Sequence, residues 1–170
     1  GRHNVENSLA AYIVAREAGI NPQKIKDALK SFRGVKRRFE YIIESPDLIF
    51  IDDYAHHPEE IRSLLSSTRE LHPGRKLTIV FQPHLYSRTR DLYQDFARTL
   101  DNADDVILLP IYPAREEPIP DITSDIIFRE LQTPNKHLVE KSNLLNVLEE
   151  NPPEVLLTAG AGDIDAMIKP

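Results

Sequence analysis

Seven consecutive residues, 52–58, contain two carboxylates, a phenol and two imidazoles (Asp-Asp-Tyr-Ala-His-His-Pro). They follow the apolar run 48–51 and precede an expected helix. Neighbouring His and Asp side chains can bind a metal ion, but the adjacent His56 and His57 would diverge on a helix or a strand. The pattern therefore disfavours a metal site. Its simplest interpretation is that Asp53 caps a turn and that the imidazoles lie on the surface.

A second polar segment, Phe81–Arg90 (Phe-Gln-Pro-His-Leu-Tyr-Ser-Arg-Thr-Arg), leads from an apolar run into an expected helix that begins at about Arg88. The free N–H groups of a helix amino terminus and nearby guanidinium groups favour anions, here a carboxylate or a phosphate. The segment is therefore a candidate anion site. The alternative is that Ser87 is only the N-cap of the helix and that the arginines are solvated.

Two further segments could contact a ligand. The glycines of Thr158–Asp163 (Thr-Ala-Gly-Ala-Gly-Asp) permit a close backbone approach or a tight turn. Their spacing matches neither the dinucleotide fingerprint nor the phosphate-binding P-loop with its Lys, so a structural turn is favoured. The segment Gly34–Glu40 contains the basic run Lys-Arg-Arg. Its arginines could hold a phosphate or could be solvated, and the pattern alone leaves this open.

Composition restricts the class of protein. The 170 residues, 41% hydrophobic and 28% charged, suit one globular domain of ordinary size. No run approaches the roughly 20 apolar residues of a membrane span, and no charged-then-apolar leader is present. Without cysteine there are no disulfides or thiolate sites, and a net charge of −6 argues against a broad nucleic-acid surface. We expect a cytoplasmic protein without nucleic-acid or membrane partners.

The periodicity of apolar residues predicts an α/β fold. Helices over 5–18 and 22–32 form a hairpin, and strands 40–44 and 48–52 are joined by a turn. Helices and strands then alternate. Strands are expected at 76–81, 105–109, 136–139 and 154–158, and helices at 58–71, 88–101, 122–131, 142–149 and from Asp163. This order predicts a Rossmann-like, doubly wound, mostly parallel sheet, in which ligands bind beyond the carboxyl ends of the strands. Most of the polar segments described above lie at those ends.

Five motifs occur in a familiar order and spacing. They are Gly-x-His-Asn-x-x-Asn at 1–7, Gly-Val-x-Arg-Arg-Phe at 34–39, the segment 52–58, Phe-Gln-Pro-His-x-Tyr-Ser-Arg-Thr at 81–89 and Gly-Ala-Gly-Asp at 160–163. With these motifs the whole chain resembles the Mur ligase family, in particular its L-alanine-adding members. The resemblance implies an amino-terminal UDP-sugar domain, a central ATPase domain with a P-loop, and a Rossmann-like carboxy-terminal domain that closes over the site.

The resemblance also implies a domain assignment. Residues 1–36 resemble the tail of the central ATPase domain, and residues 37–170 resemble the carboxy-terminal Mur ligase domain. Because the chain begins at Gly1 without Met and contains no P-loop sequence, we expect a fragment of a longer enzyme. We also expect this fragment to be inactive alone. The sequence does not predict an oligomeric state.

Roles of single residues follow from the resemblance, position by position. His3 and Asn7 resemble contacts to the adenine of ATP, and Asp53 resembles the aspartate near the ribose. Arg38, or alternatively Arg37, resembles the arginine that meets the ATP phosphate when the domains close. These residues form the expected ATP side of the site.

On the amino-acid side, Tyr54, His56 and Arg88 resemble the groups around the incoming amino acid, with Arg88 as the candidate for its carboxylate. His57 and His84 are additional candidates. Many relatives carry Arg where this chain has Leu85, so a contact made through that arginine is in doubt here.

The implied activity is ATP-dependent joining of L-alanine to UDP-N-acetylmuramate in peptidoglycan precursor synthesis, through an acyl phosphate. Mg²⁺ and most of the ATP would be held by the central domain, and this domain would orient substrates without a catalytic residue or metal ligand of its own. Three alternatives remain open. They are a recycling ligase that attaches a tripeptide to the same sugar, a non-catalytic binding module, and a His/Asp metallohydrolase.

Overall fold

The computed structural model describes residues 2–32 and 34–167, with side chains from Val5 onward. The chain divides into two compact units, Gly1–Val35 and Lys36–Pro170. Within the described residues, no helix is both long and apolar enough to span a membrane.

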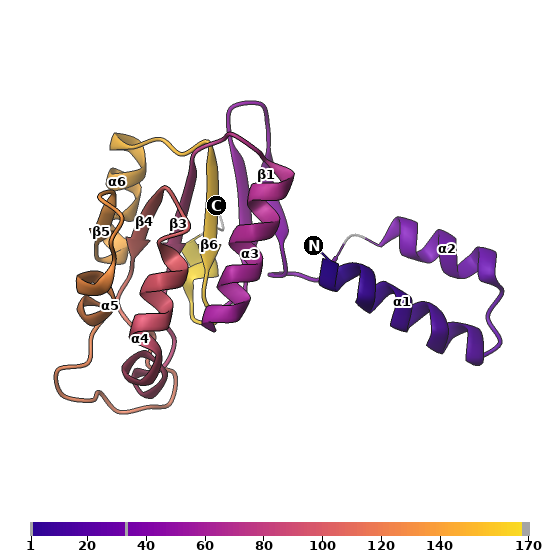
Figure 1. Ribbon diagram of the computed structural model, residues 1–170, viewed down its shortest axis with the longest axis horizontal. Helices are drawn as coiled ribbons and strands as arrows, with labels where there is room; N and C mark the ends of the chain where they lie inside the picture. The colour runs from indigo at the N-terminus through magenta and orange to yellow at the C-terminus, as the bar shows by residue number, and fades with distance from the viewer. Residues whose placement is uncertain (1, 33, 168–170) are drawn as a thin grey trace. The chain divides into compact units, whose positions relative to one another are not determined.

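The first unit is a helical hairpin of α1 (Arg2–Glu17) and α2 (Pro22–Ser31), as predicted (Figure 1). The turn after α1 contains Gly19, whose φ of 78° suits a residue without a Cβ. The Asn21 side chain accepts a hydrogen bond from the Gln23 N–H at 2.8 Å, and Pro22 occupies the first helical position. Local sequence signals therefore account for the hairpin.

The second unit contains a six-stranded sheet with the order β1-β2-β6-β3-β4-β5. The edge strand β1 (Glu40–Glu44) pairs antiparallel with β2 (Ile49–Asp53). The other strands run parallel to β2, namely β3 (Leu77–Phe81), β4 (Asp105–Leu108), β5 (Lys136–Leu138) and β6 (Val155–Ala159). The predicted mostly parallel sheet is confirmed.

Helices pack against both faces of the sheet. One face carries α3 (Pro58–Leu71), α4 (Tyr86–Leu100) and α5 (Asp125–Glu130), of which α3 and α4 lie in front of the sheet in Figure 1. The opposite face carries α6 (Leu144–Glu150) and the 3-10 helix η2 (Ile164–Met167). Within β3, Ile79 and Phe81 pack into the first layer and Val80 into the second, so the apolar strand is buried on both sides. The doubly wound architecture is thereby confirmed.

Three predicted helices differ from the structure. The region predicted as 122–131 is helical only over α5, because the Ser124 hydroxyl donates to the carbonyl of Leu109, directly after β4, at 2.6 Å and fixes the chain just before the helix. The helix predicted at 142–149 begins as the 3-10 turn η1 (Lys141–Asn143) before α6. The helix predicted from Asp163 is, in the described residues, only the 3-10 helix η2.

Candidate functional site

The candidate site lies where three neighbouring parallel strands end. Asp53 of β2 and Phe81 of β3 both align with Ala159, the last residue of β6, which lies between them. The segments that follow these strands are therefore side by side. After β3 the chain continues outward to β4 and β5, and β6 then returns on the other side of β3. Such a reversal of strand order is where open α/β sheets bind ligands.

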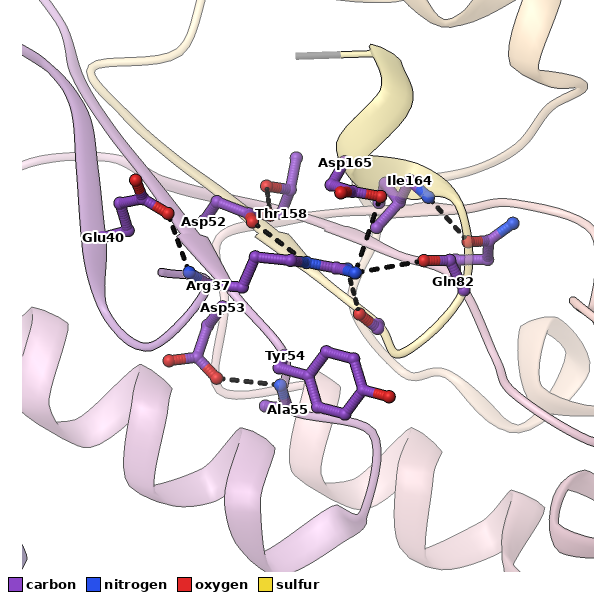
Figure 2. Close-up of polar contacts among 12 residues, drawn as sticks. Arg37, Glu40, Asp52, Asp53, Tyr54, Ala55, Gln82, Thr158, Ile164 and Asp165 are labelled. Atoms are coloured by element: carbon purple, nitrogen blue, oxygen red, sulfur yellow. Dashed lines mark hydrogen bonds and ion pairs between the residues drawn. The ribbon is translucent and has the colours of Figure 1, made fainter. Parts of the chain in front are cut away.

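Arg37 lies at the centre of a polar network at this edge (Figure 2). Its Nη2 donates to the Gly160 carbonyl at 2.6 Å and its Nη1 to the Gly162 carbonyl at 3.2 Å. Its Nε is 3.4 Å from an Asp52 carboxylate oxygen, and its Nη1 is 3.5 Å from Asp165. The Arg37 side chain is only 15% exposed. The guanidinium is therefore committed to partners within its own domain.

The two neighbouring arginines differ in environment. The Arg37 guanidinium also lies 5.0 Å from the centroid of the Tyr54 ring, in a cation–π contact. Arg38 is exposed, and its charge opposes the rise in the pKa of Asp53 that burial causes. This difference favours Arg38 over Arg37 as the arginine available to an ATP phosphate. The contact itself stays a prediction.

The two carboxylates at the end of β2 have structural partners. Asp52 accepts a hydrogen bond from the Thr158 hydroxyl at 2.6 Å, and burial raises the pKa of Asp52 although Thr158 and Arg37 oppose the shift. Asp53 accepts from the backbone N–H of Phe39 at 2.7 Å and of Ala55 at 2.8 Å. Burial also raises the pKa of Asp53. The turn capping predicted for Asp53 is confirmed, whereas its place near a ribose stays a prediction.

Four rings form a row across the strand ends. The ring centroids of Tyr54 and His56 are 5.3 Å apart, those of His56 and His84 are 5.9 Å apart, and those of His84 and Tyr112 are 5.8 Å apart. The His56 Nδ1 atom is 2.9 Å from the Tyr54 carbonyl oxygen, which restrains its imidazole. Burial lowers the pKa of His84, and the nearby charges of Arg88 and His56 add to this effect. The row is therefore an aromatic wall, with the guanidinium of Arg37 beside Tyr54 and that of Arg88 beside His84.

Arg88 lies beside this wall. Its Nη1 atom is 3.5 Å from the His84 Nδ1 atom, and its side chain is half-buried. Among the described residues, Arg88 has no carboxylate within ion-pair distance. The structure thus brings together three residues predicted for the amino-acid side, Tyr54, His56 and Arg88, and adds the predicted candidate His84.

The expectation of a helix that begins near Arg88 with free N–H groups is wrong. The helix begins at Tyr86, with Leu85 at the N-cap in a backbone conformation of positive φ (73°). The backbone N–H of Ser87 donates to the Glu116 carboxylate at 2.9 Å, and the Ser87 hydroxyl donates to it as well. The terminus therefore binds an anion that belongs to the chain, and Ser87 lies inside the first turn instead of capping it.

The remaining predicted residues lie apart from the row of rings. His57 is exposed and is the N-cap residue of α3, where its backbone N–H donates to Glu60 at 3.2 Å. Asn7 is exposed on α1, in the first compact unit. The side chain of His3 lies outside the described residues. In the part of the chain that the structure describes, no three His, Asp or Glu side chains are grouped so that they could hold a metal ion.

Two residues of the site were not predicted. Gln82 is buried, and it donates to Asp163 at 3.0 Å while accepting from the Ile164 N–H at 3.1 Å. Tyr112 stacks on His84 from the segment after β4. Gln82 lies within the selected segment 81–90 but was not singled out, and Tyr112 follows the end of β4, where the same rule would have found it. Gln82 and Tyr112 also pack so closely on Gly162 that a Cβ atom there would meet atoms at 2.5–2.7 Å.

Comparison with known proteins gives the relatives of the chain. The family model described as "Mur ligase, glutamate ligase domain" matches residues 37–162. The chain is 51% identical to UDP-N-acetylmuramate–L-alanine ligase from Cytophaga hutchinsonii, covering 100% of the chain and 36% of that relative. It is 48% identical to the protein of the same name from Porphyromonas gingivalis, covering 99% of the chain and 37% of the relative. The chain thus spans little more than a third of these curated relatives.

Solved structures show the same fold. The UDP-N-acetylmuramate-alanine ligase from Thermotoga maritima superimposes with a TM-score of 0.80 at 32% identity, covering 99% of this chain and 36% of that one. A murein peptide ligase from Psychrobacter arcticus, at 22% identity and a TM-score of 0.67, shares the fold. Because the family model covers most of the 170 residues, the chain belongs to the Mur ligase family.

Proposed function

We propose that this chain is the carboxy-terminal part of an ATP-dependent ligase that joins L-alanine to UDP-N-acetylmuramate. The observation that carries the proposal is the position of Arg88, a half-buried guanidinium beside His84 that has no ion pair among the described residues. Relatives named as L-alanine ligases, 51% and 48% identical over nearly the whole chain, support it.

The amino-acid side of the proposed site is built for positioning. Arg88 pairs with the carboxylate of L-alanine through two parallel hydrogen bonds. Tyr54 and His56 form the adjoining wall, and the Arg37 guanidinium stacks on the Tyr54 ring. Fixing the amine near the activated sugar carboxylate lowers the entropy cost of the reaction, and no side chain of this domain acts as acid or base.

The ATP side of the proposed site is shared with other parts of the enzyme. Arg38 contacts a phosphate and Asp53 the ribose, while His3 and Asn7 lie near the adenine. The chain contains no P-loop sequence, so Mg²⁺ and most of the nucleotide are held elsewhere, and the chain alone is inactive. A cytoplasmic location stays a prediction.

We assign residues 1–36 to the end of the central ATPase domain and 37–170 to the carboxy-terminal domain. The hairpin unit exposes four apolar side chains of α1, namely Val5, Leu9, Ile13 and Val14, each at least 52% accessible. Apolar residues on one helix at this density favour burial against further chain. Under this assignment, the four side chains pack against other residues of the central ATPase domain.

The test is phosphate release by the full-length protein with UDP-N-acetylmuramate, ATP and Mg²⁺. Three reactions are compared, with L-alanine, with the tripeptide L-alanyl-γ-D-glutamyl-diaminopimelate, and with no amine. Turnover specific to L-alanine is the expected result. Turnover only with the tripeptide would reassign the protein to recycling, and no turnover with either would favour the binding module.

A further inference from the structure

The carboxylate of Glu116 is bound to the first turn of α4. It accepts a hydrogen bond from the Ser87 N–H at 2.9 Å and another from the Ser87 hydroxyl. The N-cap residue Leu85 has no side-chain oxygen, so the free N–H groups of the helix take a partner from 29 positions further along the chain. These two bonds lower the pKa of Glu116, which is therefore ionised at neutral pH.

The segment that carries Glu116 runs along the segment that carries Arg88. The Tyr112 N–H donates to the Pro83 carbonyl at 2.8 Å, and the Leu85 N–H donates to the Tyr112 carbonyl at 3.0 Å. Residues 84 and 112 form a parallel bridge, and their rings stack. Four residues after Tyr112, the Glu116 carboxylate binds Ser87, the residue directly before Arg88.

Arg88 and Glu116 are close enough for each to matter to the other. The Arg88 charge contributes to the lowered pKa of Glu116, and both charges act on His84. An arginine and a carboxylate so placed would ordinarily form a bidentate pair. No such ion pair exists between these two described residues; both oxygens of Glu116 are directed instead at Ser87.

We propose that Ser87 is a positioning residue of the amino-acid site, which keeps Arg88 available to the substrate carboxylate by holding the Glu116 carboxylate on the amino terminus of α4. The carboxylate of Glu116 has two alternative partners. On Ser87 it leaves Arg88 open, and on Arg88 it takes the place of the substrate's own carboxylate. The inference rests on the proposed function, since it requires that Arg88 binds the amino acid.

The consequence is a specific kinetic effect. Losing the Ser87 hydroxyl releases one charge-assisted hydrogen bond and shifts Glu116 toward Arg88. The apparent affinity for the amino acid is then reduced in proportion to the fraction of molecules in which Arg88 remains open. Because the competition is over the carboxylate-binding group alone, kcat and the KM for ATP are unaffected.

The experiment uses the full-length enzyme and steady-state phosphate release. Ser87→Ala should raise the KM for L-alanine about tenfold, with kcat and the KM for ATP changed less than about twofold. Glu116→Gln keeps an oxygen for the helix N–H groups but has no charge to pair with Arg88. The double variant Ser87→Ala/Glu116→Gln should therefore return the KM for L-alanine to within about threefold of the wild type. Ser63→Ala, which removes an exposed α3 hydroxyl bonded to the Glu59 carbonyl, is the matched control.

Each outcome decides the question. If Ser87→Ala leaves the KM for L-alanine unchanged, or if Glu116→Gln does not rescue it, Ser87 and Glu116 form only a helix cap, and the inference is wrong. A thermal melt of each variant distinguishes a selective effect on the site from a general loss of folding. A general loss of folding would lower kcat in proportion to the folded fraction. Arg88→Ala is measured in parallel. If it does not raise the KM for L-alanine selectively, the proposed role of Arg88 fails together with the inference, whereas a selective effect without rescue rejects the inference alone.

Discussion

The Nη2 atom of Arg37 donates a hydrogen bond of 2.6 Å to the carbonyl oxygen of Gly160, 123 positions away in the chain. The contact ties the residues that enter the second compact unit to the loop after its last strand. It also distinguishes two adjacent arginines, because the side chain of Arg38 is exposed. In the basic run that the sequence leaves ambiguous, Arg37 is thus bonded within its own unit, and a ligand role for Arg38 stays a prediction.

Replacing Arg37 with Met should destabilise the second unit by about 3 kcal/mol. The substitution leaves the Asp52 carboxylate, only 2% exposed, without its cation and leaves two carbonyl groups without a donor. Urea unfolding of the 170-residue chain measures the loss. The matched control is Arg62→Met, which breaks the exposed pair with Glu59 and should cost less than about 1 kcal/mol.

A double-mutant cycle tests the cause of this loss. Asp52→Asn removes the buried charge, so Arg37→Met should cost less in that background than in the wild type. Equal costs in both backgrounds would mean that the contacts to the glycine loop, and not the ion pair, carry the effect.

Gly162→Ala should destabilise the protein by about 1–3 kcal/mol and disturb the row of rings. A Cβ atom at this position would lie 2.5 Å from the Gln82 Oε1 atom and 2.6 Å from the Tyr112 ring, so Tyr112 would have to move away from His84. Gly74→Ala is the control, because a Cβ there meets nothing within 4 Å although the φ of 78° is strained. Thermal unfolding and near-ultraviolet circular dichroism report the two effects. A change of the tyrosine signal in Gly74→Ala alone would contradict the prediction.

The stability of the protein should fall in mild acid through His84. Its pKa is lowered from the usual 6.5 by burial and by the charges of Arg88 and His56, so the neutral form is favoured in the folded state. The stability contributed by a depressed pKa is fully present above the unfolded value and is lost as the pH falls through the folded value. Between about pH 7.5 and about pH 5.5 the melting temperature of the wild type should therefore fall more than that of His84→Gln.

Asp52 and Asp53 have raised pKa values, which favour the folded state as the pH falls and so oppose the effect of His84. Both aspartates are present in the wild type and in His84→Gln, so their contribution cancels in the comparison. Parallel profiles for the two proteins would show that His84 does not contribute. Arg88→Ala should reduce the difference without abolishing it, since burial is the larger cause of the shift.

Local signals were sufficient to predict most of the fold. Helix α3 occupies the predicted residues 58–71, because Pro58 at the first helical position and a regular apolar spacing are both local. The strands β3, β4 and β6 are mostly apolar, and all of their residues are buried. The start of α4 was misplaced because its cap is supplied by the distant Glu116. The segment after β6 forms the 3-10 helix η2 up to Met167, the last described residue, with the Ile164 N–H bonded to Gln82.

The candidate site was predictable to the extent that it obeys the rule of strand ends. That rule selected the segments 52–58 and 81–90, and the resemblance to the Mur ligase family then singled out Tyr54, His56, His84 and Arg88, which the structure brings together. It could not separate Arg37 from Arg38, because the distinction depends on long-range partners in the loop after β6. No local pattern connects Glu116 with α4, so the occupied helix terminus could not be foreseen.

The assignment of Arg88 has the sharpest kinetic test. In the full-length enzyme, Arg88→Ala should raise the KM for L-alanine about 30- to 150-fold, as expected for the loss of a charge-assisted hydrogen-bonded pair of about 2–3 kcal/mol. The KM for ATP should change little. The control is Arg90→Ala, which removes an exposed arginine of the same helix, paired with Asp91, and should leave both constants unchanged.

Arg38→Ala should give the opposite pattern to Arg88→Ala, because Arg38 is assigned to a phosphate of ATP and not to the amino acid. Its effect should fall on kcat and the KM for ATP, with thermal stability retained since the side chain is exposed. The pair of variants then forms a crossed design in which each residue controls for the other. If Arg88→Ala raises both KM values equally, Arg88 does not distinguish the amino acid from the nucleotide, and the carboxylate assignment must be abandoned.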